Sequence, residues 1–554
     1  MTKPIIYQLF PRLFTNTCDH CVPNGTIVQN GVGKMNDIDS AVLDNLRELG
    51  VTHLWYTGVI RHAQKTVYKG IPACNPYIVK GNAGSPYAIT DYYDIDPDIA
   101  VSVKQRMREF ENLVTRTHDA GMKVIIDFVP NHVARQYRSI AKPDGIEDLG
   151  ENDNKDLAFS PHNNFYYMPG QQFAPGIDLG HGDGFYYEKP AMATGNDCFH
   201  PYPNVNDWYE TVKLNYGVDY TTGDRHFNPI PSTWHKMLDI LHFWASKGVD
   251  GFRCDMAHMV PVEFWNWVIP QVKEAHPGVI FIAELYNVGI YRDYIFNGHF
   301  DYLYDKVSLY DTLRAVTTGN ASASAITGCW QAVEGIGDHM LNFLENHDEQ
   351  RIASPQWAGN PLKALPALVV SATMSRAPFM IYMGQELGEP ALEAEGFSGK
   401  DGRTTIFDYW SVDSIRRWYN GGKCGTRRLT KQERELRRFY KQLLRLCNKE
   451  KAIAQGEFYD LMYANYNNMN CDKIYAYYRH YKQDRLLVVA NFGDSDENIA
   501  VGTPQHALDV MGMEPGTYQA RELITGNKLQ VTVAPGNLIE LTVPKHNAMI
   551  IKLM

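Results

Sequence analysis

Apolar residues along the first 132 positions follow two alternating patterns. The segments 51–56 and 124–126 are short apolar runs rich in β-branched and aromatic residues, as is typical of strands buried on both faces. The segments 42–49 and 107–114 instead place apolar residues at the spacing of one helical face. Strands that alternate with helices predict parallel pairing through helical crossovers, so the pattern indicates an α/β fold.

The alternation stops after residue 132 and resumes near residue 226. The intervening stretch is rich in Asn, Asp, Gly, Pro and Tyr. A structureless loop of that length is uncommon in a compact protein, so we predict an inserted domain over 133–225. An apolar helical face at 234–241 then resumes the pattern, which continues to a helix over 433–447.

The last hundred residues change character. Short strand-like runs at 474–478, 486–490 and 530–533 are separated by Gly, Asp and Asn turns. This spacing is typical of an antiparallel β-sandwich. We therefore predict a catalytic unit in two parts, 1–132 and 226–450, and a C-terminal domain over 451–554.

Composition narrows the class of protein. Of the 554 residues 44% are hydrophobic and 21% charged, which is ordinary for a globular chain of several domains. The formal net charge of -10 disfavours nucleic acid or an anionic membrane as a partner, because both attract a basic face. The aromatic share of 12% suits carbohydrate binding, since flat rings cover the apolar faces of sugars.

Three features of the sequence bear on the cellular location of the protein. The chain begins Met1-Thr2-Lys3-Pro4 and passes directly into a short apolar strand, unlike a signal peptide. No apolar run approaches the roughly 20 residues of a membrane span. The odd number of cysteines, nine, favours reduced thiols over a disulfide framework. We expect a cytoplasmic protein, and the sequence leaves its oligomeric state open.

Acidic, histidine and arginine residues gather where apolar runs end. In a barrel of parallel strands such positions meet at one face, where active sites lie. Arg253 and Asp255 are two residues apart, so their side chains share one side of a strand. The four segments are Asp-Phe-Val-Pro-Asn-His at 127–132, Gly-Phe-Arg-Cys-Asp at 251–255, Ile-Ala-Glu at 282–284 and Glu-Asn-His-Asp at 345–348.

With these four segments in this order, the chain resembles the α-amylase family of glycoside hydrolases and transglycosylases. The likeness extends from residues 5–12 to residues 380–388, and more weakly to the C-terminus. It implies a (β/α)8 TIM barrel with an inserted domain after the third strand and a C-terminal antiparallel β-sandwich domain.

The resemblance implies roles for four catalytic residues. Cleavage of a glycosidic bond needs one group to protonate the departing oxygen and another to trap the cationic sugar carbon. Asp255 resembles the nucleophile and Glu284 the acid that later serves as base. Asp348 resembles the third carboxylate, which grips sugar hydroxyls, and Arg253 the arginine that keeps Asp255 ionised.

Four further residues resemble substrate-binding positions of the family. His132 and His347 match the histidines that bond the hydroxyls of the sugar being cleaved. Tyr87 matches the tyrosine that stacks beneath this sugar. Asp127 matches a supporting aspartate that braces the arginine.

The resemblance implies no required cofactor, and we assign no metal ligand. Asn131 matches an asparagine that binds calcium in many members of the family. Met259 stands where the partner histidine is expected, and a thioether is a poor ligand for a hard cation. A structural calcium ion therefore stays an open alternative.

We expect a retaining hydrolase of α-1,4 bonds in maltooligosaccharides or starch-derived glucans, with α-1,6 activity left open. The triplet Lys213-Leu214-Asn215 falls where the family has a motif that follows specificity, and it is similar to forms between amylases, neopullulanases and cyclomaltodextrinases. A 4-α-glucanotransferase is the nearest alternative. A non-catalytic carbohydrate-binding protein is disfavoured by the complete set of Asp255, Glu284 and Asp348.

Overall fold

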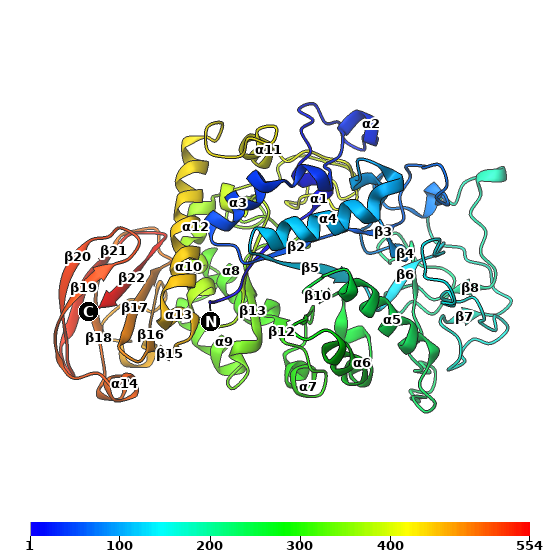
Figure 1. The fold of residues 1–554 in the computed structure, drawn as a ribbon. Helices are drawn as coiled ribbons and strands as arrows, with labels where there is room; N and C mark the ends of the chain where they lie inside the picture. Colours follow the sequence, from blue (N-terminus) through cyan, green and yellow to red (C-terminus); the bar gives the residue numbers. More distant parts are fainter. Residues whose placement is uncertain (1) are drawn as a thin grey trace.

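The computed structural model describes residues 2–554, and its centre is a closed barrel of eight parallel strands (Figure 1). The last strand pairs with the first, so the sheet has no free edge. The expected TIM barrel is thereby confirmed. In chain order its strands are β1 (Ile5–Leu9), β2 (His53–Tyr56), β5 (Lys123–Phe128), β10 (Gly251–Cys254), β11 (Ile280–Ala283), β12 (Tyr302–Tyr304), β13 (Met340–Phe343) and β14 (Phe379–Tyr382).

Helices follow the barrel strands and cover the outside of the sheet (Figure 1). The helix over residues 40–49 shows how the sequence determines where such a helix begins and ends. The Asp39 side chain accepts hydrogen bonds from the amides of Ala41 and Val42, and Gly50 ends the helix in a left-handed conformation. The main helices are α3 (Ser40–Leu49), α4 (Arg106–Asp119), α5 (Ser232–Ser246), α6 (Val262–Ala275), α7 (Tyr291–Phe296), α8 (Asp311–Thr317), α10 (Leu365–Thr373) and α12 (Lys431–Lys449).

The inserted segment follows the third barrel strand, β5, as expected. It forms two short antiparallel pairs, β6 (His132–Ala134) with β9 (Thr211–Lys213), and β7 (Tyr167–Met168) with β8 (Ala191–Met192). A small separate core lies around the β7–β8 pair and includes Tyr166, Met168, Phe173 and Tyr186, whereas Val133 of β6 and Val212 of β9 belong to the main core. The segment lies at the end of the barrel towards which β5 points (Figure 1).

A hairpin between β2 and α4 was not expected from the sequence. Strand β3 (Ile60–His62) pairs with β4 (Ile89–Ile95), although the two lie far apart in the chain. Ion pairs of Arg61 with Asp91 and Asp94 hold it in place, and all three side chains are buried. Charged residues in a buried strand hide the apolar pattern on which strand prediction depends.

The C-terminal part is an antiparallel β domain, as expected. Its six-stranded sheet has the order β15-β16-β17-β22-β19-β20, and a separate pair is formed by β18 and β21. Helices α10 and α12 lie between the barrel and this sheet (Figure 1). The strands are β15 (Glu457–Asp460), β16 (Ile474–Tyr481), β17 (Asp484–Asn491), β18 (Glu497–Gly502), β19 (Gly516–Glu522), β20 (Lys528–Val533), β21 (Leu538–Val543) and β22 (Asn547–Leu553).

A helix that crosses a membrane needs roughly 20 predominantly apolar residues. Within residues 2–554 none is both long enough and apolar enough to cross a bilayer.

Candidate active site

The barrel register brings three of the four predicted segments together. Arg253 on β10 lies beside Asp127 on β5 and beside Ile282 on β11. Asp255 follows directly after β10, and Glu284 follows directly after β11. The two carboxylates therefore stand at the carboxyl ends of neighbouring parallel strands, the usual place for catalytic groups in a barrel.

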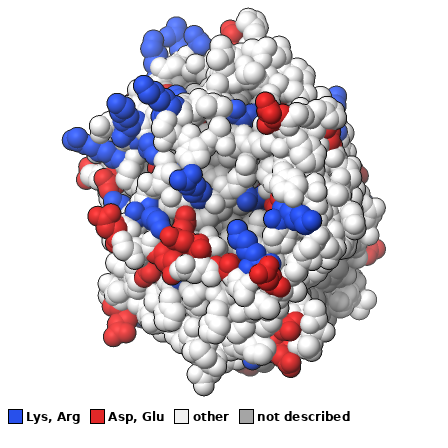
Figure 2. Space-filling model, turned by 90° about the vertical axis from the view of Figure 1, so that its right-hand side faces the viewer, with Lys and Arg blue, Asp and Glu red and all other residues white. Residues whose placement is uncertain are grey.

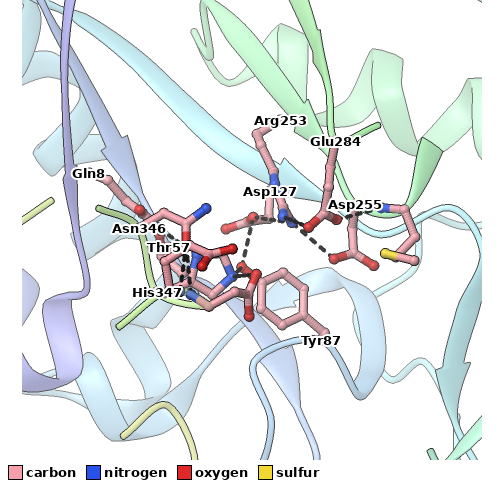
Figure 3. Close-up of polar contacts among 12 residues, drawn as sticks. Gln8, Thr57, Tyr87, Asp127, Arg253, Asp255, Glu284, Asn346 and His347 are labelled. Carbon is pink, nitrogen blue, oxygen red and sulfur yellow. Dashed lines mark hydrogen bonds and ion pairs between the residues drawn. The ribbon is translucent and has the colours of Figure 1, made fainter. Parts of the chain in front are cut away.

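Arg253 is the centre of the site and is fully buried. One terminal nitrogen lies 2.9 Å from Asp255 and 3.4 Å from Asp127, and the other lies 2.8 Å from Glu284 (Figure 3). The sequence predicted a pairing with Asp255 and a brace from Asp127. The structure adds Glu284, so the guanidinium bridges three carboxylates and does not favour ionisation of Asp255 alone.

Asp255 offers one free oxygen. Its Oδ1 accepts a hydrogen bond from Arg253, whereas Oδ2 is buried and receives none from any residue in the described part of the chain, 2–554. Burial raises the pKa of Asp255 well above its ordinary value, the neighbouring charge of Glu284 adds to this, and Arg253 opposes it. A buried carboxylate oxygen without a partner is costly unless a substrate uses it.

Glu284 is held by donors that the sequence did not reveal. The Tyr286 hydroxyl donates to its Oε1 at 2.6 Å, and the main-chain amide of Met256 donates to Oε2 at 2.7 Å. Met256 has a positive φ of 44°, a left-handed conformation that is rare for a residue with a side chain. Strain of this kind is typical of functional sites, and here it aims an amide at the carboxylate.

His347, Tyr87 and Asp127 form one hydrogen-bonded group. The Tyr87 hydroxyl lies 2.5 Å from His347 Nε2 and donates to Asp127 at 3.3 Å, and the tyrosine and histidine rings stack. The Gln8 amide nitrogen lies 2.8 Å from His347 Nδ1, so that ring nitrogen accepts and Nε2 carries the proton (Figure 3). Burial lowers the pKa of His347 to about 3, which leaves the ring neutral at ordinary pH.

Asp348 is the most accessible of the expected carboxylates. Its side chain is 42% exposed and lies 3.1 Å from His347 Nε2. The turn that carries both residues is shaped by Asn346, whose side-chain oxygen accepts from the amides of Asp348 and Glu349. The structure therefore places Asp348 at the edge of the group formed by His347, Tyr87 and Asp127.

His132 stands at the border between the barrel and the inserted segment. Its ring packs against Trp208 at 5.2 Å, and its Nδ1 lies 3.2 Å from the side-chain nitrogen of Asn131. Burial lowers the pKa of His132 to about 3, and nearby Lys213 adds to the effect. Among residues 2–554 no hydrogen bond or ion pair joins His132 to the carboxylates of Asp255 or Glu284.

Sequence reasoning missed several residues around Arg253. Trp55 donates to Asp127 at 3.0 Å, the Tyr304 hydroxyl accepts from Arg253 at 3.2 Å, and both rings lie against the guanidinium. Trp55 and Tyr304 each end or nearly end a barrel strand. That strand-end position was the available signal, because aromatic residues there face the same opening as the carboxylates.

At the position where the family resemblance suggests calcium, the oxygen atoms surround the ammonium of Lys213, which leaves no room for a metal ion beside it. The Asn131 side-chain oxygen lies 2.6 Å from the ammonium of Lys213, and the Met259 carbonyl lies 3.4 Å from it. A cation of the protein already occupies the space between these oxygens. In addition, no group of three or more His, Cys, Asp or Glu side chains among residues 2–554 is arranged to hold a metal.

A cavity of about 1060 Å³ lies elsewhere, between the barrel and the C-terminal domain. Trp330, Arg376, Phe458 and Tyr463 are among its lining residues. Within residues 2–554, none of the predicted site residues lines this cavity. The volume of a cavity is therefore not what locates the active site. The buried guanidinium of Arg253 and the three carboxylates around it indicate where the active site lies.

An eight-stranded parallel barrel whose strand ends carry Asp255 and Glu284 around a buried arginine defines a barrel glycosidase. Family models agree. One described as "Alpha amylase, catalytic domain" matches residues 8–175 and 228–456, and one described as "Alpha amylase, C-terminal all-beta domain" matches residues 466–554. The chain belongs to the α-amylase family, and it is a glycosidase.

Individual relatives are distant but similar over nearly the whole chain. Alpha-amylase 3 of Dictyoglomus thermophilum is 22% identical, across 94% of this chain and 91% of its own. Cyclomaltodextrinase of Thermoanaerobacter pseudethanolicus is 22% identical, across 92% of this chain and 74% of its own. The α-amylase of Geobacillus thermoleovorans, solved with acarbose, superposes with a TM-score of 0.63 at 17% identity, across 100% of this chain and 98% of its own.

Proposed function

We propose that this enzyme is a retaining glycosidase that cleaves α-1,4 bonds in maltooligosaccharides through a covalent intermediate on Asp255. The observation that carries the proposal is the state of that carboxylate. One oxygen is fixed by Arg253, and the other is buried, unpartnered in the described chain and free to attack. A second carboxylate, Glu284, is anchored to the same guanidinium.

In the first step Asp255 Oδ2 attacks the anomeric carbon and forms an ester bond to the sugar. The bond from that carbon to the glycosidic oxygen breaks, and protonated Glu284 donates its proton to the departing oxygen. With Glu284 protonated, the carboxylates of Asp127 and Asp255 still outnumber the guanidinium of Arg253, so the site keeps an excess of negative charge. That excess favours the cationic sugar of the transition state.

In the second step Glu284, now ionised, takes a proton from a water molecule. The water oxygen attacks the anomeric carbon from the side that the leaving group left, and the ester to Asp255 breaks. Two inversions at one carbon retain its configuration. Retention predicts carboxyl groups about 5 to 5.5 Å apart, whereas inverting enzymes keep them roughly 6.5 to 9.5 Å apart.

The neutral histidines fit a substrate rich in hydroxyl groups. Burial keeps His132 and His347 uncharged, so each ring offers a donor and an acceptor and no net charge. The hollowed face at the end with the inserted segment carries both acidic and basic side chains (Figure 2). Mixed charge suits a neutral glucan better than a charged polymer. One relative carries the name cyclomaltodextrinase, and one solved neighbour holds acarbose.

The test is incubation of the wild type and an Asp255→Asn variant with maltooligosaccharides of defined length. We expect shorter products from the wild type, α-configured when first released as judged by NMR, and no turnover by the variant. First-formed β products would exclude retention.

Products longer than the substrate would make the enzyme a 4-α-glucanotransferase. If neither sample changes the substrate, α-1,4 specificity is wrong, and α-1,6-linked glucans, sucrose and trehalose are the next substrates.

A further inference from the structure

Lys213 places a positive charge inside the protein, beside the candidate active site. It is the last residue of β9, and its side chain is 1% exposed. The ammonium lies 2.6 Å from the Asn131 side-chain oxygen, 2.6 Å from Asp197 Oδ1 and 3.4 Å from the Met259 carbonyl oxygen. Burying an ammonium is costly unless its surroundings are arranged to receive it.

The three partners are all oxygen atoms of kinds that hard cations prefer. A carboxylate, a side-chain amide and a main-chain carbonyl are the usual ligands of a divalent ion such as Ca²⁺. Asp197 adopts a left-handed backbone with φ of 61°, a conformation that Asp tolerates better than most residues. The geometry is that of a cation site whose occupant belongs to the chain.

The partners come from three separate segments. Asn131 follows β5 of the barrel, Met259 ends the short helix after β10 (Ala257–Met259), and Asp197 belongs to the inserted segment. The ammonium therefore ties the inserted segment to two strand ends of the barrel. One of these, after β10, begins with Asp255.

The contacts of Lys213 extend to His132, the histidine expected to bind substrate. The Asn131 amide nitrogen lies 3.2 Å from His132 Nδ1 and donates to the Gly195 carbonyl at 2.7 Å. His132 also pairs directly with Lys213 in the β6–β9 ladder. A side-chain carbon on Gly195 would lie 2.9 Å from the His132 ring, so loop and histidine are tightly packed. Whatever fixes Asn131 also fixes the position of His132.

We propose that the ammonium of Lys213 does the structural work of a bound divalent cation, joining the inserted segment to the barrel and positioning His132. The fold and the activity then need no metal ion at this place. Removal of the ammonium leaves three oxygens around a vacated cation site, which an added divalent ion can fill.

The first test measures the thermal midpoint of the wild type and Lys213→Ala, each with EDTA and with millimolar CaCl₂. The wild type is expected to have the same midpoint in both solutions. Lys213→Ala is expected to unfold several degrees lower in EDTA and to recover part of that loss with Ca²⁺. This readout does not depend on which glucan is the substrate, so it can fail independently of the proposed function.

The matched control is the double variant Lys213→Ala with Asp197→Asn. It lacks the carboxylate, so Ca²⁺ should no longer raise its midpoint. If Lys213→Ala does not fold, Lys213→Arg tests the same idea, because it keeps the charge and should remain insensitive to EDTA. A wild type that loses stability in EDTA would overturn the proposal, as would a Lys213→Ala midpoint equal to that of the wild type.

The positioning role has its own readout. Loosening His132 should raise KM for a maltooligosaccharide about tenfold, the equivalent of one lost hydrogen bond to the sugar, with a smaller effect on kcat. Ca²⁺ should restore part of that KM in Lys213→Ala and none of it in the double variant. A variant with wild-type KM and a lowered midpoint would show that Lys213 stabilises the fold without positioning the histidine.

Discussion

At the scale of single residues, the candidate site depends on one guanidinium shared by three carboxylates. The two terminal nitrogens of Arg253 reach Asp127, Asp255 and Glu284, and Tyr304 accepts from its third nitrogen. A lysine would keep the charge but present a single point of contact. We predict that Arg253→Lys lowers kcat/KM by about 10²- to 10³-fold, measured on a defined maltooligosaccharide.

The Arg253→Lys variant distinguishes the planar geometry of the guanidinium from its positive charge. Circular dichroism should show an unchanged fold, since the positive charge and most of the buried stem are retained. A variant with activity near that of the wild type would mean that charge alone suffices and that the planar bridge has no role.

Tyr286 gives a second prediction at this scale. Its hydroxyl donates to Glu284 Oε1, the oxygen that also faces Arg253. Tyr286→Phe removes the donor and keeps the ring, so we expect kcat to fall about tenfold, the size of one hydrogen bond to a charged group, with little change in KM. Steady-state kinetics on one substrate measures both constants.

The control for Tyr286 is Tyr286→Ala, which removes the ring as well. It should raise KM in addition, because the ring is partly exposed where a bound sugar could contact it. Equal kcat for the wild type and Tyr286→Phe would argue against a role of the hydroxyl in holding Glu284.

Residue identity explains which parts of the site could be predicted. Asp255, Glu284 and Arg253 lie in short motifs at the ends of apolar strands, so type and position together revealed them. Gln8 carries no such signal, because it acts through His347, which is distant in the chain. Tyr286 lies only two residues beyond Glu284, but no local pattern shows that its hydroxyl turns back to that carboxylate. The tie between Lys213 and Asp197 depends on the path of the inserted segment, which no local pattern specifies.

At the scale of elements, local pattern predicted the barrel strands better than the hairpin. Strand β5 is apolar after its first residue up to Asp127, and its partner β2 is apolar after its first residue as well. Strand β4 contains Asp91 and Asp94, which both pair with Arg61 on β3, and Asp94 pairs with Arg106 as well. Pairing between distant strands stabilises such a sequence only after folding, so periodicity alone missed it.

Helix α12 gives the prediction that belongs to this scale. It is the longest helix at 19 residues, and it begins with a capping box in which Thr430 accepts from the Glu433 amide and Glu433 accepts from the Thr430 amide. We predict that Thr430→Ala lowers the free energy of unfolding by about 1 kcal/mol. Denaturant unfolding measures this difference, and kcat/KM should stay unchanged because the cap lies outside the site.

Lys431→Ala is the matched control for the cap. It alters the next residue of the same turn, whose side chain is 85% exposed and makes only a long ion pair with Glu435 at 4.0 Å. Exposed pairs of this kind contribute little. If both variants lost stability equally, the effect would belong to the helix terminus as a whole and the capping box would not explain it.

At the scale of the whole molecule, buried histidines and buried carboxyl groups respond to pH in opposite directions. Burial lowers the pKa of His62, His132 and His347 to about 3. The unfolded chain therefore gains protons below about pH 6.5 that the folded chain does not, and stability falls on acidification. Burial raises the pKa of Glu345 to about 7 and that of Glu395 to about 8. For these two groups the folded chain holds protons that the unfolded chain releases, so their contribution to stability decreases as pH rises.

Glu395 contributes to the pH response on the alkaline side. The folded protein holds a proton on this buried carboxyl group up to about pH 8, whereas the unfolded chain releases it near its ordinary value of 4.5. Stability therefore decreases as pH rises across that window and levels off above it. We predict that between pH 6.5 and 9 the thermal midpoint of the wild type falls relative to that of Glu395→Gln, which mimics the protonated acid. Lys3, whose pKa burial lowers to about 7, acts in the opposite direction and equally in both proteins, so it cancels from this difference. Calorimetry at several pH values measures both curves, and parallel curves for the two proteins would assign the alkaline loss to other groups.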